Sequence, residues 1–217
     1  MGCLAHFDEV FSTYKHDSEI SRINRCVIAE SAYSDEMRVV LALCEATKRA
    51  TRGYFDIRLA GRMDPSGLVK GFAISSAARL LLARGFANFF IEIAGDAQVH
   101  GRNPEGERWR VGIQNPFDLQ EFVEVVHLSN RGIATSGNYV QGEHIHDPIR
   151  GVRATDIASM TVVGPTACDA DRFATAAFAM GEEGIHFIEA LEGFEGYVIT
   201  RDRMSCATSG FDQYTCE

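Results

Sequence analysis

The spacing of apolar residues changes near residue 86 of this 217-residue chain, and this change constrains the fold more than any other feature. Before it, residues 34–53 and 70–85 carry apolar side chains at helical spacing, and each stretch ends at a glycine. Beyond it come short runs rich in β-branched and aromatic residues, bounded by Gly, Pro or Asn. These predicted strands are residues 87–95, 108–114, 122–129, 158–164 and 196–201. Helical patterns return at 166–181 and 184–192.

The order of these elements predicts an α+β fold with mixed or antiparallel sheets and packed helices. The strands come partly in succession and partly separated by helices, whereas a doubly wound parallel sheet would alternate the two more strictly. No long linker interrupts residues 1–217, so we expect a single domain, with two closely packed halves as the alternative.

Net charge and hydropathy limit whether this chain binds nucleic acid or crosses a membrane. The net charge of -9 argues against a nucleic-acid groove, which needs a basic surface. No stretch approaches the ~20 apolar residues of a membrane span. The first residues also lack the basic and apolar regions of a signal peptide. We therefore expect no transmembrane segment and a cytoplasmic location for the chain as given.

Cysteine and glycine patterns indicate which sites are not signalled. The six cysteines form no CxxC pair, which predicts reduced, separate thiols in place of a zinc site or a disulfide framework. The glycines match neither the dinucleotide-binding fingerprint nor the P-loop. Any nucleotide site in this chain must therefore be built in another way.

Two glycine-containing turns are candidate ligand sites. Asp64 to Gly67 forms a turn, and Lys70 opens the helix that follows. Backbone N–H groups at a helix start beside a lysine favour an anion such as phosphate, although a plain capped turn fits equally well. Gly95-Asp96 follows a predicted strand, where glycine lets a ligand approach the backbone. A hairpin turn is the better interpretation of that stretch taken alone.

Residues 134–151 form a third candidate, predicted as a long polar loop between strands. Loops of this length without secondary structure are uncommon unless they are functional. His144 and His146 alternate, so in an extended chain they point to opposite sides and do not bind one metal together. The loop instead favours a histidine that acts as a general base.

The helix predicted at 166–181 is the fourth candidate. It is mostly Ala, Phe and Met, yet Asp171 and Thr175 lie four residues apart on one face. Two oxygen ligands on one face suit a hard cation such as Mg2+. The alternative is an aspartate that interacts with the helix dipole and a threonine bonded to its own helix. Taken alone, this helix favours the alternative.

Together, the motifs resemble the ApbE family of FAD-dependent FMN transferases. The resemblance covers residues 7–201, and its motifs occur in the family's order: Phe11-Ser12-Thr13-Tyr14, Ser18 to Asn24, Gly53-Tyr54-Phe55-Asp56, Asp64 to Gly71, Ala94-Gly95-Asp96, residues 134–139, 144–151 and 159–181. So many motifs in one order make the resemblance specific.

The resemblance implies an ApbE-like architecture related to the T-fold, and a flavin site. Such enzymes split the pyrophosphate of FAD and attach the FMN half through a phosphoester to a threonine of an acceptor protein, releasing AMP. Some members instead hydrolyse FAD to FMN and AMP. The implied cofactor is Mg2+, the implied substrate is FAD, and the implied partner is a flavin-acceptor protein.

The resemblance also implies roles for individual residues. His144 would be the general base for the incoming hydroxyl, and Tyr14 would stack on FAD. The other contacts to FAD would come from Tyr54, Phe55, Asp56, Asp64, Lys70 and His146. The carbonyl of Gly67, with Asp171 and Thr175, would hold Mg2+, so Thr175 is a ligand and not the flavin acceptor.

The chain departs from the family pattern at several positions. The family usually begins with a further strand and the front of the first helix, and the segment between Asp56 and Asp64 is short here. Ala94 replaces a glycine, His146 replaces a branched apolar residue, and Ile149-Arg150 replaces a basic residue and a threonine. The missing first strand favours one rival, a degenerate, non-catalytic flavin-binding module. A second rival, an FAD pyrophosphatase, differs from the transferase only in that water attacks in place of a protein threonine.

Overall fold

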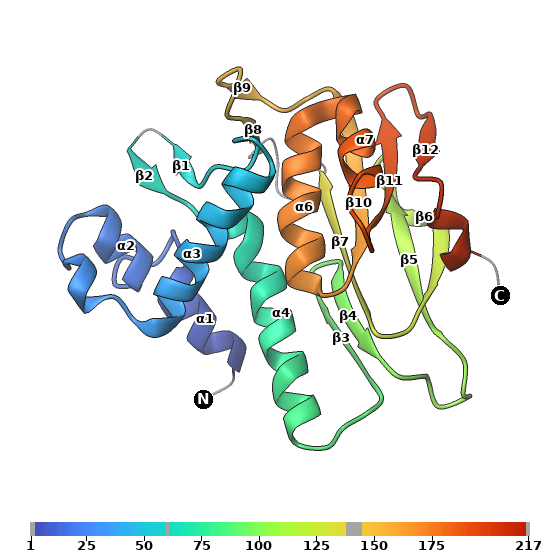
Figure 1. The fold of residues 1–217 in the computed structure, drawn as a ribbon, viewed down its shortest axis with the longest axis horizontal. Coiled ribbons are helices and arrows are strands. Elements are labelled where there is room, and N and C mark those ends of the chain that lie inside the picture. The colour runs from blue at the N-terminus through green and yellow to red at the C-terminus, as the bar shows by residue number, and fades with distance from the viewer. Residues whose placement is uncertain (1–2, 60, 138–144, 216–217) are drawn as a thin grey trace.

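A computed structural model describes residues 3–59, 61–137 and 145–215, and it combines helices with antiparallel strands (Figure 1). The α+β prediction is confirmed. The helices are α1 (Cys3–Phe11), α2 (Glu19–Asn24), α3 (Asp35–Ala50), α4 (Ser66–Ala83), α6 (Ala167–Met180) and α7 (Gly184–Glu189), with short 3-10 turns at Glu30–Ala32, Gly181–Glu183 and Phe211–Tyr214.

A six-stranded antiparallel sheet forms the centre, in the order β12-β11-β10-β7-β4-β3. Its strands are β3 (Phe89–Ile93), β4 (Asp96–His100), β7 (Arg131–Gly137), β10 (Ile157–Gly164), β11 (Glu195–Thr200) and β12 (Ser205–Ala207). Three two-stranded pairs accompany it: β1 (Arg58–Leu59) with β2 (Arg62–Met63), β5 (Trp109–Asn115) with β6 (Asp118–Leu128), and β8 (His146–Asp147) with β9 (Val152–Arg153).

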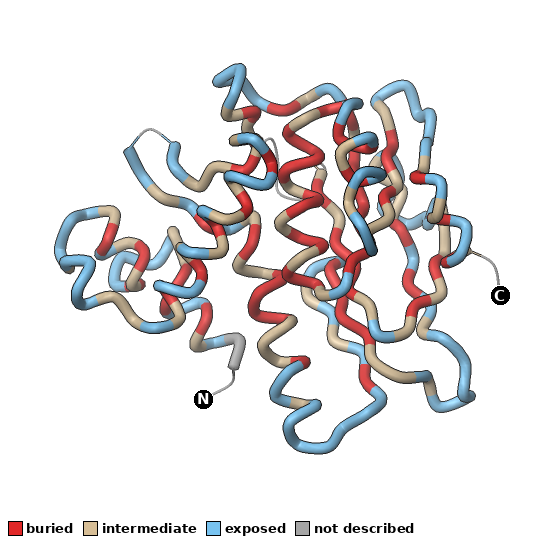
Figure 2. Tube along the Cα trace, viewed as in Figure 1, coloured by how far each residue is buried: buried red, intermediate tan, exposed pale blue. Residues whose placement is uncertain are grey.

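The central sheet is covered on both faces. Met160 and Val162 of β10 pack in one core with the apolar side chains of α6, whereas Val163 packs in another with β5 and β6. Strand β4 alternates in the same way, since Ala97 and Val99 lie in the β5–β6 core. Buried residues therefore line α6 and the middle of the sheet (Figure 2). The site described below lies on the α6 side.

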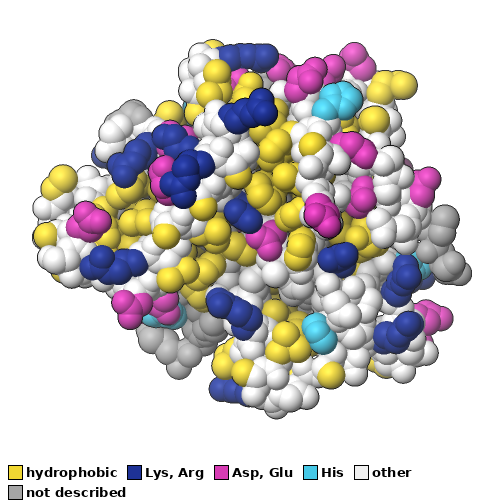
Figure 3. All heavy atoms as spheres, in the orientation of Figure 1, with side chains coloured by type: hydrophobic (Ala, Val, Ile, Leu, Met, Phe, Trp, Pro, Cys, Tyr) yellow, Lys and Arg dark blue, Asp and Glu magenta, His cyan; other side chains and the backbone are white. Residues whose placement is uncertain are grey.

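A second layer of helices packs on α4. Its apolar face and Cys168 of α6 join the buried side chains of α1, α2 and α3 in a separate core. Within the described residues, α4 alone has the length and apolar composition to cross a membrane, a test that core helices also pass. On the face drawn in Figure 3, apolar atoms lie between scattered Lys, Arg, Asp and Glu side chains, so neither sign of charge dominates that face.

Helix α6 is fixed at its start by three side chains from three elements. Thr166 Oγ1 accepts a hydrogen bond from Asp169 N (3.1 Å), as a helix cap does. Gln98 Oε1 accepts from Ala167 N (2.7 Å), and Ser75 Oγ accepts from Cys168 N (3.0 Å). The first N–H groups of this helix thus tie it to β4 and α4.

Most predicted elements are confirmed, with shifted ends. Ser34 caps α3 by accepting a hydrogen bond from Met37 N at 3.1 Å, and α4 begins four residues before the predicted start at 70. The strand predicted at 87–95 is shorter and ends in a hairpin, with Gly95 at φ +88°. The hairpin interpretation of Gly95-Asp96 is therefore correct.

The prediction of one polar loop over residues 134–151 is wrong at both ends. Residues 131–137 form the central strand β7, which pairs with β10 and β4. Gly132 is needed there, because a Cβ atom would lie 2.0 Å from the nitrogen of Ala167. Because the start of α6 lies so close, Gly132 cannot be replaced by a larger residue, and a glycine does not predict a strand. His146 and Asp147 belong to the short strand β8.

The cysteines allow a first prediction. Burial raises the pKa of the thiols of Cys44 and Cys168 to about 12, whereas Cys26 and Cys206 are exposed. Because the thiolate is the reacting form, iodoacetamide at pH 8 is expected to label Cys26 and Cys206 but not Cys44 or Cys168. Peptide mass spectrometry of native and urea-unfolded protein measures this. Equal labelling of Cys44 in both states would contradict the described burial.

Candidate functional site

The site lies where the start of α4 meets the middle of α6. Thr175 Oγ1 donates a hydrogen bond to the carbonyl oxygen of Gly67 (3.1 Å), and it lies 3.3 Å from Ser136 Oγ of β7. A Cβ atom on Gly67 would lie 2.8 Å from Thr175 Cγ2, so only glycine fits this approach without displacement. Two residues 108 positions apart in the chain thus present neighbouring oxygens.

Asp171 lies one turn before Thr175 and is 5% exposed. Its Oδ2 accepts a hydrogen bond from Gly71 N (2.8 Å), and no described residue donates a hydrogen bond to its Oδ1. Burial, and then the neighbouring Asp96 carboxylate, raise the pKa of Asp171 well above its usual value, against the attraction of Lys70. A cation at the free oxygen would relieve this buried charge.

These three residues fit a magnesium ion. A carbonyl, a hydroxyl and a carboxylate are all hard oxygen donors. Adjacent ligands of an octahedral ion bonded at 2.0–2.1 Å lie about 3 Å apart, close to the 3.1 Å between Gly67 O and Thr175 Oγ1. Among the described residues no group of three His, Cys, Asp or Glu side chains is placed to hold a metal, so a zinc-type ligand set is not formed there.

Lys70 supplies a positive charge beside this group. Its Nζ lies 2.9 Å from Asp96 Oδ2, and Asp96 Oδ1 accepts a hydrogen bond from Thr135 N (3.1 Å). Burial works against the lysine cation, yet the attraction of Asp96 and then Asp171 raises its pKa, so Lys70 stays charged. Burial also raises the pKa of Asp96, which is 1% exposed.

Asp96 is the residue that sequence reasoning missed as part of the site. The sequence indicates the Gly95-Asp96 turn as a candidate ligand site, but it assigns no binding or catalytic role to the Asp96 carboxylate. Its signal in the sequence is an acidic residue at the start of a strand, ahead of Ala97 and Val99, which pack in the β5–β6 core. The deciding feature is the packing of α4 over β4, which local pattern does not contain.

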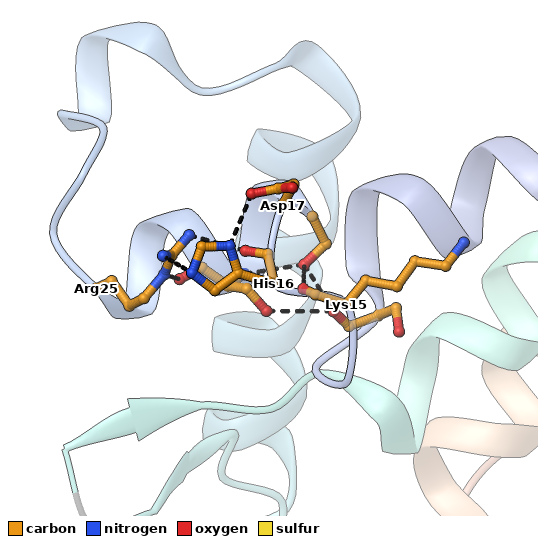
Figure 4. A network of polar contacts seen from close by, with 7 residues as sticks. Lys15, His16, Asp17 and Arg25 are labelled. Atoms are coloured by element: carbon orange, nitrogen blue, oxygen red, sulfur yellow. Dashed lines mark hydrogen bonds and ion pairs between the residues drawn. The ribbon is translucent and has the colours of Figure 1, made fainter.

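Tyr14 lies at the tip of the loop between α1 and α2 and is 98% exposed. Hydrogen bonds from Ser18 stabilise the backbone of this loop: Ser18 Oγ donates to the carbonyl oxygens of Ser12 (2.6 Å) and Lys15 (3.0 Å). Arg25 Nη2 donates to the carbonyl oxygen of His16 (2.8 Å), and Arg25 Nη1 contacts Nε2 of the His16 ring (Figure 4). The tyrosine ring is thus displayed in solvent by a fixed backbone.

The predicted contacts at residues 54–56 separate into different environments. Phe55 is 3% exposed and packs in the core with α1 and α3, so its side chain contributes to packing. Asp56 pairs with Lys48 at 2.6 Å and lines a surface cavity of about 270 Å³. Tyr54 is half-buried against the α6 core. Only Tyr54 and Asp56 therefore keep side-chain surface for a ligand.

Asp64 and the two histidines complete the predicted set. Asp64 Oδ1 accepts a hydrogen bond from Ser66 N (3.0 Å), which forms a turn just before α4, although the N-cap residue Pro65 makes no side-chain cap. His146 is half-buried in β8, paired with Arg153 of β9. His144 lies outside the described residues, so its place relative to Lys70 and Asp171 stays a prediction.

Known proteins are similar to this chain in sequence. The model of the ApbE family matches residues 1–63 and 58–198. The FAD:protein FMN transferase of Escherichia coli K12 is 33% identical over 156 residues, which are 67% of this chain and 44% of that protein. The Klebsiella pneumoniae enzyme of the same name is 32% identical over 150 residues, 64% of this chain and 43% of its own. The matched segment thus spans less than half the length of these relatives.

Solved structures share the fold over nearly the whole chain. The flavin transferase ApbE of Vibrio cholerae superimposes with a TM-score of 0.84 at 25% identity, covering 98% of this chain and 87% of the other. The apbe protein of Thermotoga maritima gives a TM-score of 0.89 at 20% identity, covering 99% and 89%. At the latter identity the likeness concerns the fold alone.

Proposed function

The chain belongs to the ApbE family, and from this premise we propose that it is an FAD-dependent flavin transferase. In this proposal it cleaves the pyrophosphate of FAD, attaches the FMN half through a phosphoester bond to a threonine of an acceptor protein, and releases AMP. Relatives named FAD:protein FMN transferase support the overall reaction. Magnesium and the threonine acceptor are the finer parts of the proposal.

The observation that carries the proposal is the junction of α4 and α6. There Gly67 and Thr175 present two oxygens 3.1 Å apart, and Asp171, a buried residue, presents a carboxylate oxygen without a described hydrogen-bond partner. These residues would hold Mg2+, which when bound would neutralise charge on the phosphates that the reaction separates. A set of partly accessible oxygens beside a lysine suits phosphoryl transfer better than simple ring binding.

The remaining residues act on the substrate. Lys70 forms an ion pair with Asp96 at 2.9 Å, and its ammonium group carries three N–H donors, so it can also contact phosphate oxygens. Tyr14 offers an exposed ring on which an aromatic ring of FAD can stack. Tyr54, Asp56, Asp64 and His146 stay proposed contacts to FAD, and Phe55 would support them through packing.

His144 is the proposed general base. A threonine hydroxyl is a weak nucleophile at neutral pH and needs a neighbouring group that takes its proton. An imidazole has the right intrinsic pKa for this step. His144 belongs to the segment between β7 and β8, which both end near the α6 core.

One assay separates transfer from hydrolysis. The protein is incubated with FAD and MgCl2, with and without a peptide containing one candidate threonine, and AMP and peptide mass are measured. AMP together with an FMN mass on the peptide is the expected result. AMP and free FMN under both conditions would replace the transferase with an FAD pyrophosphatase. FAD binding without any AMP would contradict both enzymes.

A further inference from the structure

Two buried carboxylates share one lysine at this site. Asp96 of β4 is 1% exposed and Asp171 of α6 is 5% exposed. Lys70, whose side chain is 27% exposed, pairs with Asp96 at 2.9 Å and is also attracted by Asp171. With all three groups ionised, the trio carries one uncompensated negative charge in a region of low dielectric.

The choice of partner by Lys70 decides which carboxylate stays open. Lys70 immediately precedes Gly71, whose N–H binds Asp171 Oδ2, so the lysine and Asp171 meet at the same turn of α4. The lysine nevertheless pairs with Asp96, whose other oxygen is fixed by the backbone N–H of Thr135 in β7 (3.1 Å). The hydrogen bond from Thr135 of β7 therefore fixes the Asp96 carboxylate independently of its ion pair with Lys70.

We propose that Asp96 is a positioning residue that keeps the Lys70 ammonium away from Asp171 and thereby keeps Asp171 open to the metal ion. This rests on the magnesium site of the proposed function. If Asp96 is neutral, Lys70 loses its partner and has Asp171 as the next buried carboxylate in reach. An ammonium on Asp171 would compete directly with a cation for the same oxygen.

The variant Asp96→Asn removes the pairing with little change in shape. Asparagine has one acceptor oxygen where aspartate has two, so it cannot serve Thr135 N–H and Lys70 in the wild-type way. Whichever way the amide turns, its NH2 group faces one of these two donors. Lys70 is therefore expected to move to Asp171.

The test is a titration of Mn2+ into the protein without FAD or acceptor, with free Mn2+ followed by electron paramagnetic resonance, so that the phosphate contacts proposed for Lys70 do not enter the measurement. Asp96→Asn is expected to weaken Mn2+ binding about tenfold or more, the scale seen when groups that support a metal ligand are changed. The double variant Asp96→Asn with Lys70→Met is expected to bind within about threefold of wild type, because no ammonium is left to compete. A crystal structure of Asp96→Asn should show Lys70 Nζ beside an Asp171 oxygen.

The outcomes are separable. Unchanged Mn2+ affinity in Asp96→Asn, or a double variant as weak as the single one, would overturn the inference while the proposed function stands. If the wild type itself binds no Mn2+, the magnesium site of the proposed function fails and the inference with it. If Asp96→Asn does not fold, by circular dichroism, the double variant decides alone, and weak binding there contradicts the inference.

Discussion

Replacing Asp171 by asparagine is expected to lower Mg2+-dependent AMP release about a hundredfold or more, while the metal-free protein becomes no less stable. Losing a charged ligand to a catalytic metal removes several kcal/mol of transition-state stabilisation. Asparagine keeps an oxygen that accepts from Gly71 N, now 2.8 Å from Asp171 Oδ2. It also removes a buried charge that Asp96 repels. Activity and stability are therefore expected to move in different directions.

The measurement pairs AMP release with urea unfolding in EDTA and in MgCl2. Asp169→Asn on the same helix is the matched control, because Asp169 pairs with Arg172 at 2.8 Å and is not among the proposed ligands. It should retain AMP release. Undiminished Mg2+-dependent release in Asp171→Asn, or a clear loss of its stability in EDTA, would refute the assigned role.

Replacing Gly71 by alanine is expected to destabilise the protein by about 2 kcal/mol or more, against the usual rule for helices. Alanine in place of glycine inside a helix normally stabilises it by roughly 0.5–1 kcal/mol. Here a Cβ atom would lie 2.4 Å from the carbonyl oxygen of Ala167 and 2.7 Å from Asp171 Cβ. Because both neighbours belong to α6, the two helices must separate, and overpacking of this kind costs about 1–3 kcal/mol.

The same separation is expected to weaken metal binding, since Gly67 and Thr175 meet across the same pair of helices. Urea unfolding and the Mn2+ titration measure both effects. Ser76→Ala, also in α4 but half-buried, is the control and should change the free energy of unfolding by less than about 0.5 kcal/mol. A stabilised Gly71→Ala variant would show that α4 and α6 are not in close contact.

The sequence predicted the main helices and most of the strands because these depend on the spacing of apolar residues along a short stretch of chain. Helices α3 and α6 have a regular apolar face and a side-chain cap at the start, so their existence followed from spacing and end signals. Helix α4 is apolar on more than one side and has no side-chain cap, so its start was placed four residues too late. Strand β7 was missed because Gly132, Ser136 and Gly137 are poor strand formers. At Gly132 the small size is required by the start of α6, which lies far along the chain.

The site could be predicted only in part for a similar reason. Helical spacing places Asp171 and Thr175 on one face. The residues of this helix taken alone, however, favour an aspartate that interacts with the helix dipole and a threonine bonded to its own helix. The meeting of Thr175 with Gly67 came from the family resemblance, and the structure brings these two together. The burial of Phe55 and the role of Asp96 depend on how α4 packs, which no spacing along the chain encodes.

Crystals grown with FAD and MnCl2 test the metal site at the junction of α4 and α6 most directly. An anomalous difference map near the manganese absorption edge is predicted to show one peak within about 2.5 Å of Gly67 O, Thr175 Oγ1 and an Asp171 oxygen. The hydrogen bond from Thr175 to Gly67 would then be replaced by two bonds to the ion. A peak elsewhere, or that hydrogen bond intact with FAD bound and no peak beside it, would contradict the assignment.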